Sequence, residues 1–249
     1  MIETFSSMCD SFYVNLRLGT QMGMPRNRET LLHFFEQMQK AFPDLTRFRR
    51  TDQHEYAMEE DRDGEAYRWV SVEQARLSAG HVNPPSIEEA MKLHHTVMDR
   101  APHALGLSLV EIDYLDVLLG FDLDYAGNHD QIVAESLWVD SPLAQLLDEP
   151  GARAMDFQPT CTVALSEDSR LQARIDVVTR SAPPSRRMGE FNDEAISVYF
   201  ILRRYWGDRR REPLETLLDH MCEQAVDVAA RLVVPKVVAP IRAAIGSRP

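Results

Sequence analysis

The chain has 249 residues, 44% of them hydrophobic and 27% charged, a composition that permits a sizeable core and excludes a disordered protein. Acidic residues outnumber basic ones 39 to 27, and the resulting formal charge of −12 disfavours general binding to nucleic acid. No apolar run approaches the roughly 20 residues of a membrane helix, and no signal peptide is recognisable. We therefore expect a soluble, cytoplasmic protein without membrane contact.

The first part of the chain predicts alternating strands and helices. The expected order is strand, helix, strand, strand, helix, strand, at residues 12–18, 27–43, 56–58, 67–79, 86–102 and 105–125. Asn27 and Ser86 can cap the two helices, Glu89 completes a capping box with Ser86, and Pro43 and Pro102 are expected to end them. This order is that of the split βαβ, or ferredoxin-like, unit.

The second part predicts a similar order. The expected elements are a strand at 117–125, a helix at 128–139, a hairpin of 161–165 and 171–177, a mobile loop at 181–192, a strand at 196–202, and a helix at 214–232 that Pro235 breaks before a short apolar segment at 237–245. The prediction is therefore an α+β fold in which an antiparallel sheet carries helices on one face. Two ferredoxin-like halves would form one curved unit, divided into residues 1–115, 116–212 and a packed C-terminal helix and tail at 213–249.

Four stretches resemble a known protein family: Ala41-Phe42-Pro43, Gln74 to Leu77 running on to Val82-Asn83-Pro84, Leu109 to Tyr114, and Leu217 to His220. On these residues the chain resembles a sporadically distributed bacterial family of uncharacterised proteins, although Asp113-Tyr114-Leu115-Asp116 departs from the family's Tyr-Ile-Asn form. The resemblance implies an α+β fold and no catalytic residue. The sporadic distribution implies an accessory or interaction role within a defence or mobile-element gene cluster.

The densest group of acidic residues comprises Glu111, Asp113, Asp116, Asp122, Asp124 and Asp130. Asp122 and Asp124 would share one face of a strand, where two carboxylates could hold a cation such as Mg²⁺. The favoured interpretation is that Phe121, Leu123 and Tyr125 face the core while the acids face water. We therefore predict no metal and no cofactor.

Histidine and cysteine residues show no spacing typical of zinc sites, and no nucleophile or phosphate-loop motif occurs. His94 lies on the inner stripe of its helix, and His81 stands at a strand end where a site could form. We interpret both as ordinary core or surface residues. Cys9, Cys161 and Cys222 are predicted to be buried thiols. No catalytic residue is predicted, and enzymatic activity is left open but disfavoured.

One basic segment interleaves arginine with aromatic residues, and its candidate partner-binding residues are Arg203, Arg204, Trp206, Arg209, Arg210 and Arg211. Such a segment can bind an acidic protein surface, or grip phosphates and stack bases. Three hypotheses follow. The preferred one is a non-enzymatic interaction protein that binds another protein or a second copy of itself. The alternatives are a small-molecule-binding protein or enzyme with a pocket inside the curved sheet, and nucleic-acid binding through residues 203–211.

Overall fold

The structure is a computed structural model that describes residues 2–50, 55–180, 194–206 and 213–248. Its helices are α1 (Ile2–Ser6), α2 (Arg28–Ala41), α3 (Ile87–Ala104), α4 (His129–Leu137), the 3₁₀ helix η1 (Pro142–Asp148), α6 (Leu214–Val228), the π-helix η2 (Ala229–Val238) and α7 (Ala239–Gly246). Its strands are β1 (Ser11–Thr20), β2 (Arg47–Arg50), β3 (Tyr56–Glu59), β4 (Tyr67–Val72), β5 (Arg76–Val82), β6 (Ile112–Tyr125), β7 (Thr160–Ala164), β8 (Leu171–Val178) and β9 (Glu194–Tyr205).

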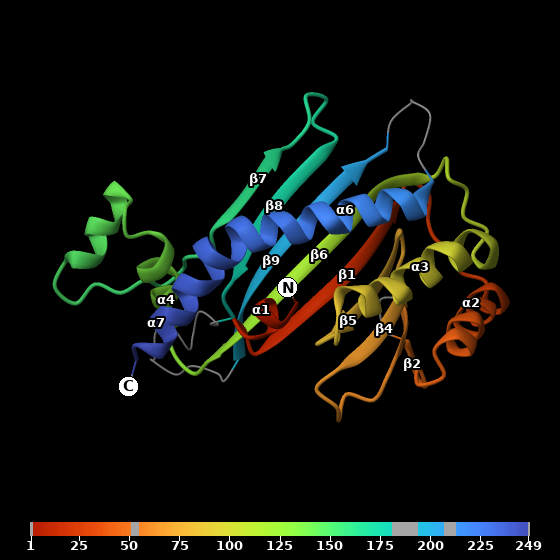
Figure 1. The fold of residues 1–249 in the computed structure, drawn as a ribbon, viewed down its shortest axis with the longest axis horizontal. Helices are drawn as coiled ribbons and strands as arrows, with labels where there is room; N and C mark the ends of the chain where they lie inside the picture. Colours follow the sequence, from red (N-terminus) through yellow and green to blue (C-terminus); the bar gives the residue numbers. More distant parts are fainter. Residues whose placement is uncertain (1, 51–54, 181–193, 207–212, 249) are drawn as a thin grey trace.

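Within these ranges, nine strands form one antiparallel sheet in the order β2-β3-β4-β5-β1-β6-β9-β8-β7. The helices lie over one face of it (Figure 1): α3 contacts β1 and β5, α6 contacts β6 and β9, and α2 packs against α3. The core fills this interface, because every second residue of β1, such as Val14 and Leu16, is buried beneath the helices. The predicted α+β class with a large antiparallel sheet is confirmed.

The prediction of two ferredoxin-like halves is not confirmed. In the first part of the chain the strand order is β4-β5-β1-β6, with the hairpin partners β3 and β2 added outside β4. On the other side of β6 the neighbours are β9, β8 and β7, so the three last strands follow one another as a meander beside β6. The predicted boundary between residues 115 and 116 falls inside β6, which pairs with both β1 and β9.

Several predicted elements differ from the observed ones. The expected strand at 67–79 is a hairpin of β4 and β5, closed by a hydrogen bond from Glu73 N–H to the Arg76 carbonyl. The extended stretch begins at Ile112 rather than at residue 105. Helix α3 runs two residues past Pro102 instead of ending there. The exposed strand β2 and the short helices α1 and η1 were not predicted.

The C-terminal segment forms a continuous helix rather than a helix broken at Pro235. Proline lacks an N–H group and its ring clashes with the carbonyl four residues earlier, and the wider π-helix η2 surrounds it here. Leu218, Val233, Val238 and Ile241 along this helix are buried against the rest of the protein. In the part of the chain that the structure describes, no helix has both the length and the apolar character needed to cross a membrane.

Cysteine placement corrects one prediction. Cys222 is buried and Cys9 is half-buried, and burial raises the pKa of each thiol to about 12. Cys161 is exposed, so the prediction that it is buried is wrong. The reason is topological: β7 is the edge strand of the sheet, and all five of its residues are exposed.

Candidate binding face

The sheet has a second face on which the described helices do not lie, and we call it the helix-free face (Figure 1). It is formed by the residues that alternate with the core positions, including Tyr13, Asn15 and Arg17 on β1. The registers of β6 and β9 place Asp116 beside Arg17 and Arg203 beside Asp116 on the same face. This face therefore carries polar and aromatic residues together with a few apolar ones, such as Leu118 and Ile201.

Aromatic rings on the helix-free face lie flat against glycines of neighbouring strands. A Cβ atom on any of these glycines would overlap with the ring that covers it, so only glycine permits the contact. There are three such pairs among the described residues: Gly19 with Tyr114, Gly80 with Trp69, and Gly120 with Tyr13. The rings are consequently held in place by the backbone beneath them.

The first cluster on this face centres on Arg203. Its Nε and Nη2 donate to the two carboxylate oxygens of Asp116 over 2.6 and 2.7 Å, and its Nη1 donates to the Tyr205 hydroxyl over 3.1 Å. The guanidinium lies 3.9 Å from the ring centre of Tyr114 and 5.5 Å from that of Tyr205. The hydrogen bond to Asp116 raises the pKa of Arg203, which therefore stays charged. The N–H groups of Arg203 named here therefore form hydrogen bonds within the protein.

The other predicted partner-binding residues do not join Arg203. Arg204 is the next residue on β9, so it points to the opposite face of the sheet and pairs in register with Leu115. Trp206 is half-buried and packs against the core, and its backbone N–H donates to the Asp113 carbonyl over 2.9 Å. Arg209, Arg210 and Arg211 lie outside the described residues. In the described part, the basic segment thus spans both faces of a strand.

The second cluster on the helix-free face centres on Asp122. Its Oδ1 accepts hydrogen bonds from the Tyr13 hydroxyl over 3.0 Å and from the Ser197 hydroxyl over 2.6 Å. Arg180 donates to the Ser197 oxygen over 2.8 Å and to the Tyr199 hydroxyl over 3.2 Å. Burial, followed by the charge of Asp122, raises the pKa of Tyr13, so its hydroxyl remains a donor.

A hollow of about 320 Å³ opens beside the second cluster, and we call it the Trp69 hollow. The side chains that matter for its chemistry are Tyr13, Asn15, Glu65, Tyr67, Trp69 and Asp122. Asn15 is only 8% exposed, and its Oδ1 has no hydrogen-bond partner within the described ranges. An unpaired buried acceptor is costly, so the position calls for a donor. Of its lining residues, only Asp122 was a candidate in the sequence, as part of the acidic stretch near which a pocket inside the sheet was considered.

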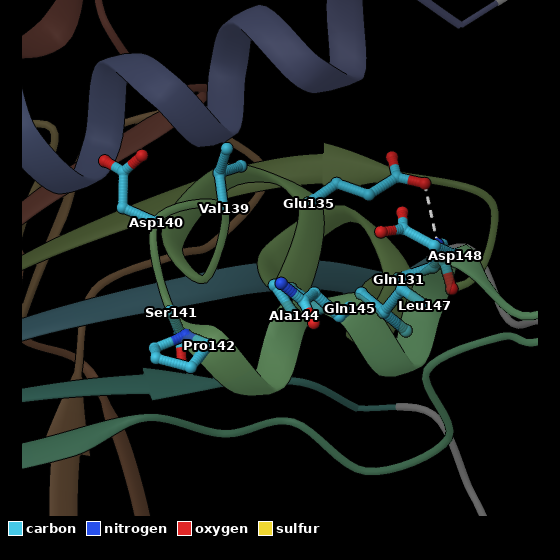
Figure 2. A pocket seen from close by; sticks show the side chains of 11 residues that line it. Gln131, Glu135, Val139, Asp140, Ser141, Pro142, Ala144, Gln145, Leu147 and Asp148 are labelled. Atoms are coloured by element: carbon cyan, nitrogen blue, oxygen red, sulfur yellow. Dashed lines mark hydrogen bonds between the residues drawn. The ribbon is translucent and has the colours of Figure 1, made fainter.

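A larger hollow of about 550 Å³ lies between α4 and η1, away from the sheet centre. Figure 2 shows Glu135, Asp140 and Asp148 around it. The Gln131 amide nitrogen donates to Glu135 over 2.7 Å, and its oxygen accepts from the Ala154 N–H over 2.6 Å. Glu135 also pairs with an arginine of the C-terminal segment. The contact with Ala154 ties the loop before β7 to α4, and the contact with the arginine ties α4 to the C-terminal segment.

The predicted acidic stretch divides into different environments. Phe121 and Leu123 face the core as expected, and Asp122 and Asp124 share the opposite face. The prediction that all the acids face water is wrong for Asp116 and Asp130, which are fully buried. Arg203 covers the first, and the second accepts from the Phe157 N–H over 2.9 Å and the Thr179 hydroxyl over 2.8 Å. Among the described residues, no group of three potential metal ligands comes together.

The two candidate histidines are buried on the helix-covered side. His94 Nε2 lies 3.2 Å from the Val14 carbonyl, and burial lowers the pKa of His94 to about 3. Burial and then the charge of Arg68 lower the pKa of His81. The Nδ1 atoms of both rings have no hydrogen-bond partner in the described part of the chain. His81 therefore belongs to the core side of β5 and not to the Trp69 hollow.

No protein-family model matches the sequence, and no curated protein is significantly similar to it. Among solved structures, the chain is similar to the crystal structure of the di-domain ARO/CYC BexL from the BE-7585A biosynthetic pathway. The identity is 9%, the match covers 82% of this chain and 80% of that chain, and the TM-score is 0.21.

Proposed function

We propose that the protein is a non-enzymatic accessory component that binds another protein through the helix-free face of its sheet. The observation that carries the proposal is the layer of aromatic rings held flat on glycines, beside the guanidinium of Arg203. Tyrosine, tryptophan and arginine are the residue types that dominate binding energy at protein interfaces. Because the rings are already immobilised, a partner that binds them does not bear the entropic cost of ordering them.

The net charge favours a partner with a basic surface. With 39 acidic and 27 basic residues, the chain has a formal charge of −12, which attracts positively charged surfaces and speeds their association. The same charge disfavours nucleic acid as the partner. A second copy of this acidic chain is likewise disfavoured, and light scattering tests that alternative.

Three further predictions remain proposals. We propose a cytoplasmic location, and an accessory role within a defence or mobile-element gene cluster, in line with the family resemblance of the sequence. We also keep the interpretation of the first part of the chain as a ferredoxin-like unit, which the strand order β4-β5-β1-β6 supports.

The test starts from the native lysate. A partner captured on the tagged protein is identified and purified, and its dissociation constant is measured for the wild type, for Tyr199→Ala on the helix-free face, and for Leu232→Ala. Leu232 is 43% exposed on the C-terminal helix, which lies over the opposite side of the sheet, and it serves as the matched control. We expect Tyr199→Ala to weaken binding by about tenfold and Leu232→Ala to leave it unchanged.

The proposal is overturned if Tyr199→Ala binds the purified partner as tightly as the wild type does. It is also overturned if light scattering finds only a monomer and the native lysate yields no partner. A dimer that Tyr199→Ala dissociates would replace the basic partner with a second copy of the chain.

A further inference from the structure

We infer that the Trp69 hollow binds the ammonium group of a lysine side chain that the partner protein presents. This inference rests on the proposed function and specifies which chemical group the helix-free face recognises. It combines three observations on the hollow: aromatic rings, carboxylates and an unpaired buried amide oxygen.

The first observation is the aromatic lining. Trp69 and Tyr67 on β4 and Tyr13 on β1 line the hollow. Faces of such rings attract cations, and tryptophan does so most strongly. A cation of the chain itself already uses this property, because the Arg62 guanidinium lies 5.2 Å from the ring centre of Tyr67. Trp69 and Tyr13 are fixed over Gly80 and Gly120, so both rings are positioned before a ligand arrives.

The second observation is the distribution of negative charge. Asp122 comes from β6 and Glu65 from the turn before β4, so the two carboxylates line the hollow from different elements. The hydrogen bonds to Asp122 among the described residues come from the neutral hydroxyls of Tyr13 and Ser197. Arg180 makes its hydrogen bonds to Ser197 and Tyr199 and interacts with Asp122 by charge alone, so no cation of the described residues forms a hydrogen bond to this carboxylate.

The third observation is Asn15, which points to a donor and not to any cation. Its side chain is more than nine-tenths buried, lines the hollow, and carries an Oδ1 atom without a partner among the described residues. The Oδ1 atom has almost no exposed surface and lies against Gly80 beside the Trp69 indole, so a donor that reaches it removes the cost of the unpaired acceptor. A protonated primary amine has three donors and can serve acceptors that lie in different directions.

Size and geometry favour lysine over larger or planar cations. A volume of about 320 Å³ is at the lower limit of small-molecule pockets, which suits the end of one side chain. The Oδ1 atom of Asp122 already accepts from the Tyr13 and Ser197 hydroxyls, so this carboxylate does not offer both of its oxygens to a planar guanidinium fork. A compact ammonium on a flexible stem fits such a site.

The test follows the indole N–H signal of Trp69 by NMR in ¹⁵N-labelled protein, with the signal assigned from a Trp69→Phe variant. The probe is Nα-acetyl-lysine methylamide, titrated at constant ionic strength. We expect a saturable shift with a dissociation constant in the millimolar range, as is typical for a single cation–π site with carboxylates. Asp122→Asn and Glu65→Gln should each weaken it about threefold, whereas Glu223→Gln on the exposed surface of α6 should not change it.

Three results would overturn the inference. The first is an equal shift with Nα-acetyl-norleucine methylamide, which lacks the charge. The second is no saturable shift with the lysine probe. The third is at least tenfold tighter binding of tetramethylammonium, which would assign the hollow to a free quaternary ammonium compound. If the lysine probe causes no saturable shift but Tyr199→Ala still weakens partner binding, this inference alone is rejected. If the lysine probe binds but Tyr199→Ala leaves partner binding unchanged, the proposed function alone is rejected.

Discussion

Arg203 and Asp116 depend on each other because the carboxylate is fully buried and the guanidinium holds both of its oxygens. Arg203→Ala leaves a buried charge unpaired, and we expect the free energy of unfolding to fall by about 3 kcal/mol in urea titrations. Arg203→Lys keeps the charge but not the bidentate contact with Asp116, so the decrease in the free energy of unfolding should be intermediate. Arg174→Ala removes an exposed arginine paired with Asp176 and should cost less than about 0.5 kcal/mol. Similar losses for Arg203→Ala and Arg174→Ala would contradict this account.

The same pair illustrates what could not be predicted at the scale of single residues. Alternation along β6 indicated correctly that Asp116 and Asp122 leave the core side of the strand, but alternation says nothing about what lies beside them. Asp116 is buried because β9 places Arg203 next to it, and this register joins residues 87 positions apart. A strand pattern therefore predicts the face of a side chain but not its neighbours.

At the scale of elements, the β4–β5 hairpin is held by the contact between Trp69 and Gly80. Gly80→Ala inserts a methyl group where the indole and the Asn15 oxygen lie, and we expect it to cost about 1–3 kcal/mol in denaturant unfolding. Combining it with Trp69→Ala should cost less than the sum of the single changes, because the overlap with the ring disappears and only that with the Asn15 oxygen remains. Gly246→Ala, where a Cβ meets no atom within 4 Å, is the control and should be nearly neutral. Strict additivity would disprove the contact.

Helix starts were the most predictable elements because their signals are local. The side chains of Asn27 and Ser86 accept backbone N–H bonds at the first turn of their helices, as the sequence predicted, and Asn128 does the same at the start of α4. Strand ends were less predictable. Strand β2 (Arg47–Arg50) is fully exposed and has no apolar alternation, and the turn between β4 and β5 contains neither glycine nor proline. The missed elements lacked the residue types on which pattern reasoning depends.

For the whole molecule, the buried histidine His94 predicts a loss of stability in acid. Its pKa is lowered to about 3 by burial, with smaller effects from His81 and His95, so the folded protein keeps it neutral. The unfolded chain takes up the proton below about pH 6.5. The contribution of His94 to the free energy of unfolding is therefore complete above pH 6.5. It declines toward pH 3 by up to about 1.4 kcal/mol per pH unit. The free energy of unfolding of His94→Gln, measured in urea, should depend less on pH below about 6.5 than that of the wild type. His103→Gln, an exposed control, should follow the wild type.

The Trp69 hollow is also a property of the whole molecule. Its lining comes from β1, β4, β5, β6 and the turn before β4. These segments meet only because the sheet places β5 and β1 between β4 and β6. None of the residues forms a local motif, which explains why the sequence drew attention to the arginine segment instead. The class of the fold depends on periodicity and was predictable, but the composition of its outer face depends on strand order.

The paired rings and glycines constrain how this protein can change through evolution. In each pair, a larger residue can replace the glycine only in a lineage that has already lost the ring, and a new ring can settle only where the opposite strand has become glycine. Mutations at these positions should therefore be inherited as linked events between distant sites. Related sequences should therefore keep or lose the ring and the glycine of a pair together. This dependence would appear as covariation between the two positions, which conservation at single positions does not show.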